Sequence, residues 1–323
     1  MSRSAILLVG GMGTRLHPLT LSIPKPMLPV AGVPFTEHQI VKAREAGITQ
    51  IVLATAFKAE IFRPYFGDGE KFGIEIKYAV EESALGTGGA IRNAADQLKG
   101  TGPVAIFNGD VLTGHDLDGQ FKFHEKKRAD VSLYLTQVPD ARAFGAVELD
   151  NDFRVKAFNE KMENPPTNII NAGCYIFNRE IINQIPNGIV VSVERETFPQ
   201  LLNTGAKVYG FVDTSYWLDI GTPAALLKAS QDLLSGAINS SATPKVSGNY
   251  LALDGAVIAP SAKVGGYSVI GAGAEIGAEA SVEGSVIFDG AKIGTGAKLT
   301  NCFVAPNFQV PADLVGINNF FGF

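Results

Sequence analysis

The sequence predicts an α/β protein, in which a Rossmann-like, mixed but mostly parallel sheet is followed by a short left-handed parallel β-helix. Two observations lead to this prediction. Up to about residue 234, short β-rich runs alternate with amphipathic helical patterns, which is typical of βαβ units. Beyond that point, aliphatic residues recur every six positions, which is the hexapeptide pattern of a β-helix. We place the two domains at residues 1–236 and 237–323.

The first βαβ unit has the clearest pattern. A buried strand at 5–9 is followed by a long loop at 10–34, a helix at 35–46 and a second strand at 50–55. Further strands are predicted at 74–80, 104–107, 131–137, 146–149, 155–158 and 169–177. A helix at 223–234 and a Ser-, Ala- and Gly-rich linker at 235–243 complete this half of the chain.

The second half is defined by its aliphatic period. The repeat comprises Ile258, Val264, Ile270, Ile276 and Val282 and, after a one-residue slip, Ile287, Ile293 and Leu299. Three six-residue faces make one coil, so the module has only a few turns. A disordered Gly- and Ala-rich tail is the alternative, but such tails lack a sustained aliphatic period.

Composition excludes several classes of protein. With 46% hydrophobic and 18% charged residues, the chain of 323 residues is unlike a disordered protein. Its formal net charge of -5 disfavours nucleic acid or an anionic membrane as the main partner. Cys174 and Cys302 lie far apart and fit neither a zinc site nor a disulfide framework, so we expect buried thiols. No secretory leader or membrane-spanning run is recognised, and we expect a cytoplasmic location.

A glycine-rich loop follows the first strand, with LVGGMGTRL at 8–16 and PKP at 24–26. Glycines let the backbone approach phosphate oxygens, an arginine offers a charged fork, and flanking prolines stiffen the segment around the lysine. This pattern predicts a triphosphate-binding loop of Gly10, Gly11, Gly13, Thr14, Arg15 and Lys25. A P-loop signature is missing, and a dinucleotide fingerprint would require glycine where Leu16 stands. The glycines alone are also compatible with a tight strand-to-helix turn.

Further motifs follow in order along nearly the whole chain: GGMGTRLHPLT, PKP, LGTGGA, FNGD, FNEK, NAGCYIF, SVERETFP and WLDIGTP. With them the sequence resembles the sugar-nucleotide pyrophosphorylase family of sugar-1-phosphate nucleotidyltransferases, and above all its mannose-1-phosphate guanylyltransferase branch with a C-terminal β-helix. The resemblance implies transfer of a nucleoside monophosphate from a nucleoside triphosphate to a sugar 1-phosphate, with release of pyrophosphate. It favours GTP and mannose 1-phosphate as substrates, Mg²⁺ as cofactor and a homo-oligomer.

The resemblance also implies roles for individual residues. Arg15 and Lys25 are the expected catalytic residues, and Asp110 and Asp219 the expected Mg²⁺ ligands. Nucleotide binding is expected from the glycine loop with Gly86, Thr87 and Asn108, and sugar-phosphate binding from Gly145, Glu160, Lys161 and Asn171.

Local alternatives exist for several of these residues. A helix cap would explain Thr87, and a turn would explain the Asn-Gly-Asp run. Glu160 and Lys161 could form a solvated ion pair on the surface. Gly145 could be a strand-edge glycine and Asn171 a turn asparagine. The chain also departs from the family at Ala84 and Met162, where relatives have proline, which leaves the base identity and the path of the sugar loop open.

The implied reaction is an in-line attack by a sugar-phosphate oxygen, which is already an anion and requires no general base. No Ser/His/Asp set can be assembled from His17, His38, His115 and His124. An acyltransferase is disfavoured because no histidine follows His124. Two alternatives remain. One is a non-catalytic sugar-nucleotide sensor. The other is uridylyl, thymidylyl or adenylyl transfer to glucose 1-phosphate, because the guanylyl and mannose assignment rests on overall similarity, notably SVERETFP at 192–199.

Overall fold

The computed structural model describes residues 2–11, 13–21, 23–55, 59–81, 83–246 and 248–323. The chain forms two compact units. The first comprises Met1–Met12 and Gln39–Trp217, and the second comprises Gly13–His38 and Leu218–Phe323. The glycine-rich loop is therefore divided between the units at its centre.

A nine-stranded sheet forms the first unit, in the order β10-β9-β11-β6-β1-β4-β5, with β8 paired to β11 and β12 paired to β8. Four strands, β5, β4, β1 and β6, run parallel, whereas β11 runs antiparallel to β6. The prediction of a mixed, mostly parallel sheet is confirmed. The strands are β1 (Arg3–Leu8), β4 (Ile48–Thr55), β5 (Glu75–Val80), β6 (Val104–Asn108), β8 (Val131–Gln137), β9 (Gly145–Leu149), β10 (Val155–Glu160), β11 (Ile169–Phe177) and β12 (Val208–Val212).

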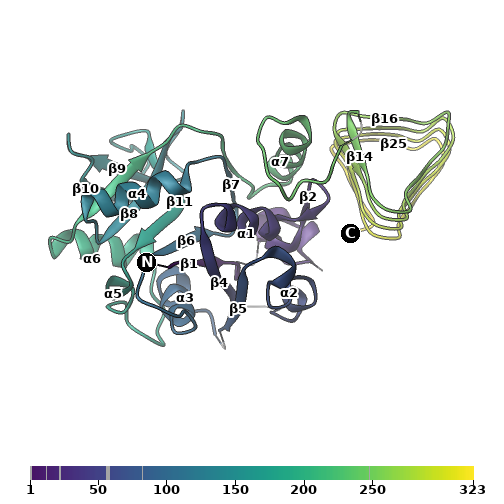
Figure 1. Cartoon of the computed structure of the whole chain (residues 1–323). Coiled ribbons are helices and arrows are strands. Elements are labelled where there is room, and N and C mark those ends of the chain that lie inside the picture. The colour runs from purple at the N-terminus through teal and green to yellow at the C-terminus, as the bar shows by residue number, and fades with distance from the viewer. Residues whose placement is uncertain (1, 12, 22, 56–58, 82, 247) are drawn as a thin grey trace. The chain divides into compact units, whose positions relative to one another are not determined.

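Helices cover both faces of this sheet (Figure 1). On one face, α3 (Gly86–Ala95), α5 (Arg179–Ile182) and α6 (Phe198–Asn203) share a continuous apolar core with the strands. On β8 that core takes Val131 and Leu133, whereas the intervening Ser132 hydrogen-bonds through its hydroxyl to His124 of α4 (Leu117–Lys127). Because side chains alternate along a strand, α4 lies on the opposite face.

Short elements complete the first unit. Most of α1 (Phe35–Glu45) belongs to it, together with α2 (Ala59–Phe66), the 3₁₀ turn η4 (Glu70–Phe72), β7 (Val111–Thr113) and the π-helical turn η5 (Val193–Thr197).

Short turns replace the long loop that the sequence predicts after the first strand. The 3₁₀ turns are η1 (Thr14–Leu16), η2 (Leu19–Leu21) and η3 (Lys25–Met27), and a two-stranded ladder joins β2 (Pro29–Val30) to β3 (Val33–Pro34). Gly13 begins the first of these turns in the left-handed region, at φ +62°, and Pro24 begins the third. Glycine and proline favour such tight turns, so the long loop predicted at 10–34 contains short regular turns and one small ladder.

The β-helix of the second unit consists of three parallel ladders, which Figure 1 shows as a three-sided stack of coils. One ladder stacks Ile258, Ile276, Ile293 and Val310 directly above one another, as the hexapeptide period predicts. The one-residue slip after Val282 leaves the registers intact. The β-helical fold is confirmed, and its strands are β14 (Tyr250–Ala252), β15 (Val257–Ile258), β16 (Lys263–Gly265), β17 (Ser268–Ile270), β18 (Glu275–Ile276), β19 (Ser281–Glu283), β20 (Val286–Ile287), β21 (Lys292–Ile293), β22 (Lys298–Thr300), β23 (Phe303–Val304), β24 (Gln309–Val310), β25 (Val315–Ile317) and β26 (Phe320–Phe321).

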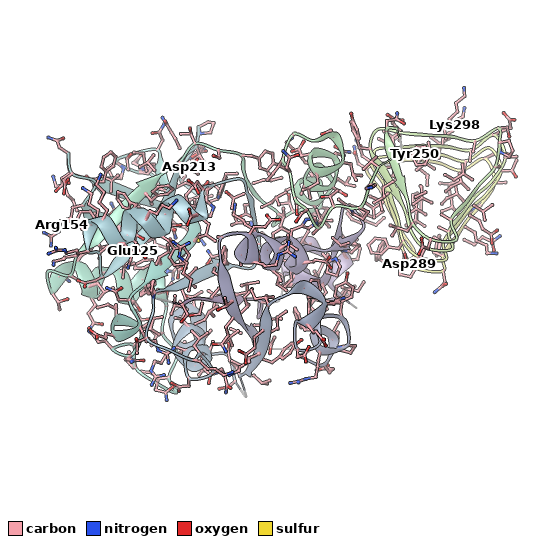
Figure 2. All side chains as sticks on the ribbon, viewed as in Figure 1. Glu125, Arg154, Asp213, Tyr250, Asp289 and Lys298 are labelled. Atoms are coloured by element: carbon pink, nitrogen blue, oxygen red, sulfur yellow. The ribbon has the colours of Figure 1, made fainter. Side chains whose placement is uncertain are left out.

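The repeat aliphatics point into the coil and polar residues point out. Lys298 lies on the outside of the stack in Figure 2, whereas its neighbour Leu299 is buried inside. The strand β13 (Trp217–Asp219) and the helix α7 (Pro223–Ser235) precede the coils. Within the second unit, the Ser230 hydroxyl of α7 accepts a hydrogen bond from the Ala31 amide at 2.8 Å.

Both cysteines are buried free thiols, as predicted. Burial raises the pKa of Cys174 to about 12. Among the described residues, every helix is too short or too polar to span a bilayer.

Candidate active site

The carboxyl ends of β1 and β6 lie side by side in the first unit. Leu8 pairs with Asn108 in parallel register, so Gly10 and Gly11 leave the sheet at the same edge as Asn108 and Asp110. Gly109 is required at this point, because a Cβ there would lie 2.2 Å from the Leu8 carbonyl oxygen. Ligands of open α/β sheets bind outside the carboxyl ends of the strands. The first unit therefore gathers four of the predicted nucleotide and metal residues at the expected edge.

The turn that carries Asp110 is fixed by side chains of α1. Gln39, which is buried, donates from Nε2 to the Asn108 carbonyl at 2.8 Å. Lys42 donates from Nζ to the carbonyls of Thr113 at 3.0 Å and His115 at 2.8 Å. Burial lowers the pKa of Lys42. The two ends of the segment around Asp110 are thus tied to one helix.

Sequence reasoning missed Gln39 and Lys42. The only signal in the sequence is their spacing, because two polar residues three positions apart lie on one side of a helix. The structure shows that this side faces the carbonyls of Asn108 and Thr113. Such a pair is difficult to distinguish from ordinary surface residues before the partner carbonyls are known.

In the second unit, Gly13 and Lys25 are in close contact. A Cβ on Gly13 would lie 2.9 Å from Cβ of Lys25, and the Thr20 hydroxyl donates to the Gly13 carbonyl at 2.9 Å. Lys25 begins a 3₁₀ turn after Pro24 and is only 7% exposed. Within the second unit, Lys25 therefore lies on a turn that begins after Pro24 and packs against Gly13.

Arg15 and Asp219 both approach Gly221 closely. A Cβ on Gly221 would lie 2.6 Å from Arg15 Nη2 and 2.6 Å from Asp219 Oδ1. The Gly221 amide also donates to Asp219 Oδ1 at 2.6 Å, which orients that carboxylate. The second unit therefore brings together a predicted catalytic cation and a predicted metal ligand that are far apart in the sequence. Thr14 is exposed on the same 3₁₀ turn as Arg15.

The first turn of α3 is packed against the chain around Val191. A Cβ on Gly86, at φ +69°, would lie 2.6 Å from the Val191 carbonyl oxygen, and the Gly88 amide donates to that oxygen at 2.8 Å. Leu85 is the N-cap residue of this helix, so the alternative in which Thr87 caps it is wrong. Instead, the Thr87 hydroxyl donates to Glu194 Oε2 at 2.8 Å and accepts from the Val193 amide at 2.9 Å.

The predicted sugar-phosphate residues gather on β9, β10 and β11. Gly145 pairs with Glu160, and a Cβ on Gly145 would lie 2.9 Å from Glu160 Oε2. Lys161 follows with φ +52° and forms a 3.5 Å ion pair with Glu160, while its side chain is 58% exposed. The neighbouring β11 is held close by the pairing of Ile170 with Ala146.

Asn171 is engaged on both sides of its amide. Its Nδ2 donates to the Tyr175 hydroxyl at 2.8 Å, and its Oδ1 accepts from the Gly173 amide at 3.2 Å. Tyr175 in turn donates to Glu194 Oε1 at 3.4 Å. Neither Tyr175 nor Glu194 was predicted, although both lie in motifs that carry the family resemblance.

The histidines have structural explanations. His115 is buried, stacks on Tyr134 with a ring separation of 4.0 Å, and has its pKa lowered to about 3 by burial. His124 hydrogen-bonds to Ser132 and Asn178, and burial lowers its pKa as well. In the second unit, His38 bonds to Val30 and Ser240. His17 is exposed.

Oxygen ligands are present for a hard divalent cation. Asp110 and Asp219, one in each unit, are partly exposed carboxylates, the donor type that Mg²⁺ prefers. Within the described ranges, no group of three or more His, Cys, Asp or Glu side chains is arranged to hold a metal ion. Of the predicted glycine-loop motif, only Met12 lies outside the described residues.

Comparison with known proteins agrees with this arrangement. The profile described as "Nucleotidyl transferase" matches residues 4–236, and the profile described as "GlmU-like, C-terminal hexapeptide" matches residues 242–319. A mannose-1-phosphate guanylyltransferase of Mycobacterium tuberculosis is 51% identical over 270 residues, which cover 83% of this chain and 75% of the relative. A mannose-1-phosphate guanyltransferase of Pichia angusta is 36% identical, over 80% of this chain and 72% of the relative.

Solved structures share the fold. HddC from Yersinia pseudotuberculosis, crystallised in complex with GMP-PN, has a TM-score of 0.60 and 29% identity, covering 72% of this chain and 99% of its own. A putative glucose-1-phosphate thymidylyltransferase from Bacillus anthracis has a TM-score of 0.67 at 22% identity, covering 75% of this chain and 98% of its own, and supports the fold alone. With a matching profile over most of its length and a relative above half identity, the chain belongs to the nucleotidyl transferase family and carries a hexapeptide module of the left-handed β-helical type.

Proposed function

We propose that the protein transfers GMP from GTP to mannose 1-phosphate, forming GDP-mannose and releasing pyrophosphate. The observation that carries this proposal is that Arg15 and Asp219 both lie against Gly221, within a unit in which Gly13 of the glycine loop also contacts Lys25. Cations on a glycine-rich backbone suit a polyphosphate, and a carboxylate beside them suits a metal bound to that polyphosphate. The guanylyl and mannose assignment is supported by the names of the relatives from Mycobacterium tuberculosis and Pichia angusta.

In the proposed reaction, an oxygen of the sugar phosphate attacks the α-phosphorus of the nucleotide, and the bond to pyrophosphate breaks. The attacking oxygen is an anion, so catalysis consists of alignment and charge neutralisation. Arg15 and Lys25 neutralise the nucleotide phosphates, and Lys161 neutralises the acceptor phosphate.

Binding roles follow from the same arrangement. Backbone amides of the glycine loop with Thr14 contact the phosphates, and Asn108 binds the nucleotide from the sheet edge that it shares with the end of β1. The backbone of Gly86 and Thr87 contacts the base, since the Thr87 hydroxyl is already occupied by Glu194 and Val193. The sugar is contacted by Glu160, Asn171 and the open backbone at Gly145.

The cofactor in this proposal is Mg²⁺. Asp110 and Asp219 would hold it, and when bound it supplies positive charge to the phosphate oxygens. The oxygen chemistry of both side chains fits this ion.

A substrate matrix tests the proposed function. Pyrophosphate release is measured with each of four nucleoside triphosphates against the 1-phosphates of mannose, glucose and N-acetylglucosamine. We expect the highest kcat/KM with GTP and mannose 1-phosphate. Preference for UTP, dTTP or ATP with glucose 1-phosphate would replace the substrate assignment, and inactivity with every pair would favour a sensor.

The wider organisation is also a proposal. We propose a catalytic domain at 1–236 and a β-helical domain at 237–323, assembled as a homo-oligomer in the cytoplasm. Support for assembly comes from apolar side chains exposed on the last coil, at Val315, Ile317, Phe320 and Phe323. Light scattering on the purified protein should give a mass that is a multiple of the 34.2 kDa chain.

A further inference from the structure

The segment 192–199, with the sequence SVERETFP, forms a hydrogen-bonded turn whose role the proposed reaction does not explain. It contains the π-helical turn η5 and continues into α6. Ser192 accepts a hydrogen bond from the Arg195 amide at 3.2 Å, and its own amide donates to Glu196 Oε1 at 2.8 Å. Single π-helical turns are frequent at functional sites. These reciprocal bonds fix the direction in which the next polar side chain, Glu194, points.

Both carboxylate oxygens of Glu194 are used inside the first unit. Oε2 accepts from the Thr87 hydroxyl at 2.8 Å and from the Ser192 hydroxyl at 3.2 Å. Oε1 accepts from the Tyr175 hydroxyl at 3.4 Å, which is long for such a bond. Glu194 therefore joins the helix that carries the predicted base-binding residues to the strand that carries a predicted sugar-binding residue.

Tyr175 continues the connection on β11. It is fully buried, and its hydroxyl accepts from Asn171 Nδ2 at 2.8 Å. Burial raises the pKa of Tyr175 well above its ordinary value, so the hydroxyl keeps its proton and remains a donor to Glu194. Thr87, Glu194, Tyr175 and Asn171 thus form one continuous chain of hydrogen bonds, which we call the Glu194 network.

Aromatic packing ties the same segment to the sugar-phosphate strand. Phe198 contacts the ring of Tyr175 edge to face at 5.1 Å and the ring of Phe158 at 5.1 Å. Phe158 lies in β10, two positions before Glu160, the first of the predicted sugar-phosphate residues Glu160 and Lys161. The segment 192–199 consequently contacts three elements that carry predicted substrate residues of the first unit, namely α3, β10 and β11.

We propose that Glu194 and Tyr175 are positioning residues that couple the nucleotide-binding segment at Gly86–Thr87 to the sugar-binding residue Asn171. The inference rests on the proposed function, since it assigns both ends of the network to substrates. Neither residue needs to touch a reacting atom. Linked hydrogen bonds inside a protein polarise one another, so a change at one end of this short, partly buried network alters the hydrogen bonding at the other. Occupation of one substrate site then favours the productive conformation of the other.

Two conservative substitutions test the coupling. Tyr175→Phe removes only the hydroxyl and keeps the ring that packs on Phe198, while Glu194→Gln keeps the shape and removes the charge. For both variants we expect KM for GTP and KM for mannose 1-phosphate to rise together, by about fivefold to tenfold. The Tyr175 hydroxyl reaches Gly86–Thr87 through Glu194, but it also has a side-chain hydrogen bond with Asn108, an expected nucleotide residue. A rise in KM for GTP therefore supports the coupling only if Glu194→Gln, which leaves the contact with Asn108 in place, produces it as well.

Tyr134→Phe is the matched control. Tyr134 is another fully buried tyrosine, on β8, whose hydroxyl accepts from Thr113 at 3.1 Å and takes no part in the Glu194 network. We expect this variant to lose comparable thermal stability while both KM values stay within twofold of the parent. If Tyr134→Phe raised both KM values as strongly as Tyr175→Phe, loss of any buried hydroxyl would explain the result and the proposal would be wrong.

A double-mutant cycle gives the decisive measurement. Thr87→Val and Tyr175→Phe cut the same network on either side of Glu194, so the double variant should lose little more kcat/KM than the worse single variant. The coupling would be overturned if the loss of kcat/KM in the double variant equalled the product of the two single losses. It would also be overturned if Tyr175→Phe raised KM for mannose 1-phosphate alone. Should Tyr175→Phe fail to fold, the cycle is run with Glu194→Gln. Failure of the proposed function is distinct, since the parent protein itself would then be inactive with every substrate pair.

Discussion

Placing a methyl group at Gly221 is the sharpest perturbation of the proposed catalytic residues. In Gly221→Ala, the new Cβ would lie 2.6 Å from Arg15 Nη2 and 2.6 Å from Asp219 Oδ1. Ordinary carbon contacts begin near 3.5 Å, so one or both groups must move by about 1 Å. The guanidinium is the end of a long flexible side chain, and it can move at little cost to the fold. Its position relative to Asp219 is then lost.

The magnitude follows from the sensitivity of phosphoryl transfer to alignment. A misplacement of about 1 Å costs on the order of 100-fold in rate. We therefore expect kcat to fall between about tenfold and 100-fold, with the midpoint of thermal unfolding nearly unchanged. The assay is steady-state pyrophosphate release with GTP and mannose 1-phosphate, together with a thermal melt of each variant.

The matched control is Gly114→Ala. A Cβ at Gly114 would meet its nearest neighbour, Cβ of Tyr216, at 3.7 Å, which is ordinary contact. This variant should keep the parent kcat. If Gly221→Ala also retained full kcat, Arg15 and Asp219 would not act from the positions they occupy, and the proposed catalytic roles would be refuted.

Three further predictions concern other parts of the molecule. Ile293→Ala removes a buried aliphatic side chain from the β-helix and should lower the free energy of unfolding in urea titrations by about 2–5 kcal/mol. Lys298→Ala, at an exposed position, should change it by less than about 0.5 kcal/mol. Equal effects of the two substitutions would contradict the assignment of Ile293 to the interior. Lys42→Met removes the hydrogen bonds to the carbonyls of Thr113 and His115. We expect kcat to fall about tenfold and the Mg²⁺ concentration that gives the half-maximal rate to rise. An unchanged Mg²⁺ requirement would exclude a role for Lys42 in positioning the Asp110 turn. Burial lowers the pKa of His115 from 6.5 to about 3, so between these pH values the unfolded chain binds a proton that the folded chain does not. The free energy of unfolding therefore decreases as the pH is lowered, by up to about 1.4 kcal/mol per pH unit. His115→Leu should reduce this slope in urea titrations from pH 6.5 to 4.5, and an identical slope would show that another group is responsible.

Local patterns predicted the regular elements well. The strands at 131–137 and 169–177 begin and end where β8 and β11 do, because alternating and β-branched runs bounded by polar residues are local signals. The six-residue aliphatic period placed Ile258, Ile276 and Ile293 in one ladder for the same reason. The carboxyl ends of β1 and β6 could also be expected to share an edge, since βαβ units form parallel sheets.

Sequence alone did not predict the antiparallel insertion of β11 beside β6 or the π-helical turn at Val193–Thr197. It also did not identify Gln39, Glu194 and Tyr175, whose partners lie far away in the chain. A hydrogen bond between Thr87 and Glu194 depends on the distance between two atoms after folding, and no spacing or propensity of either residue encodes that distance.

The amino-acid sequence by itself therefore determined the element types, the β-helical repeat and the motifs that carry the chemistry. Only the tertiary structure decided which side chains meet, as with Arg15, Gly221 and Asp219 in the second unit. The physical reason is that periodicity and turn chemistry act over a few residues, whereas active-site geometry results from packing between segments far apart in the chain.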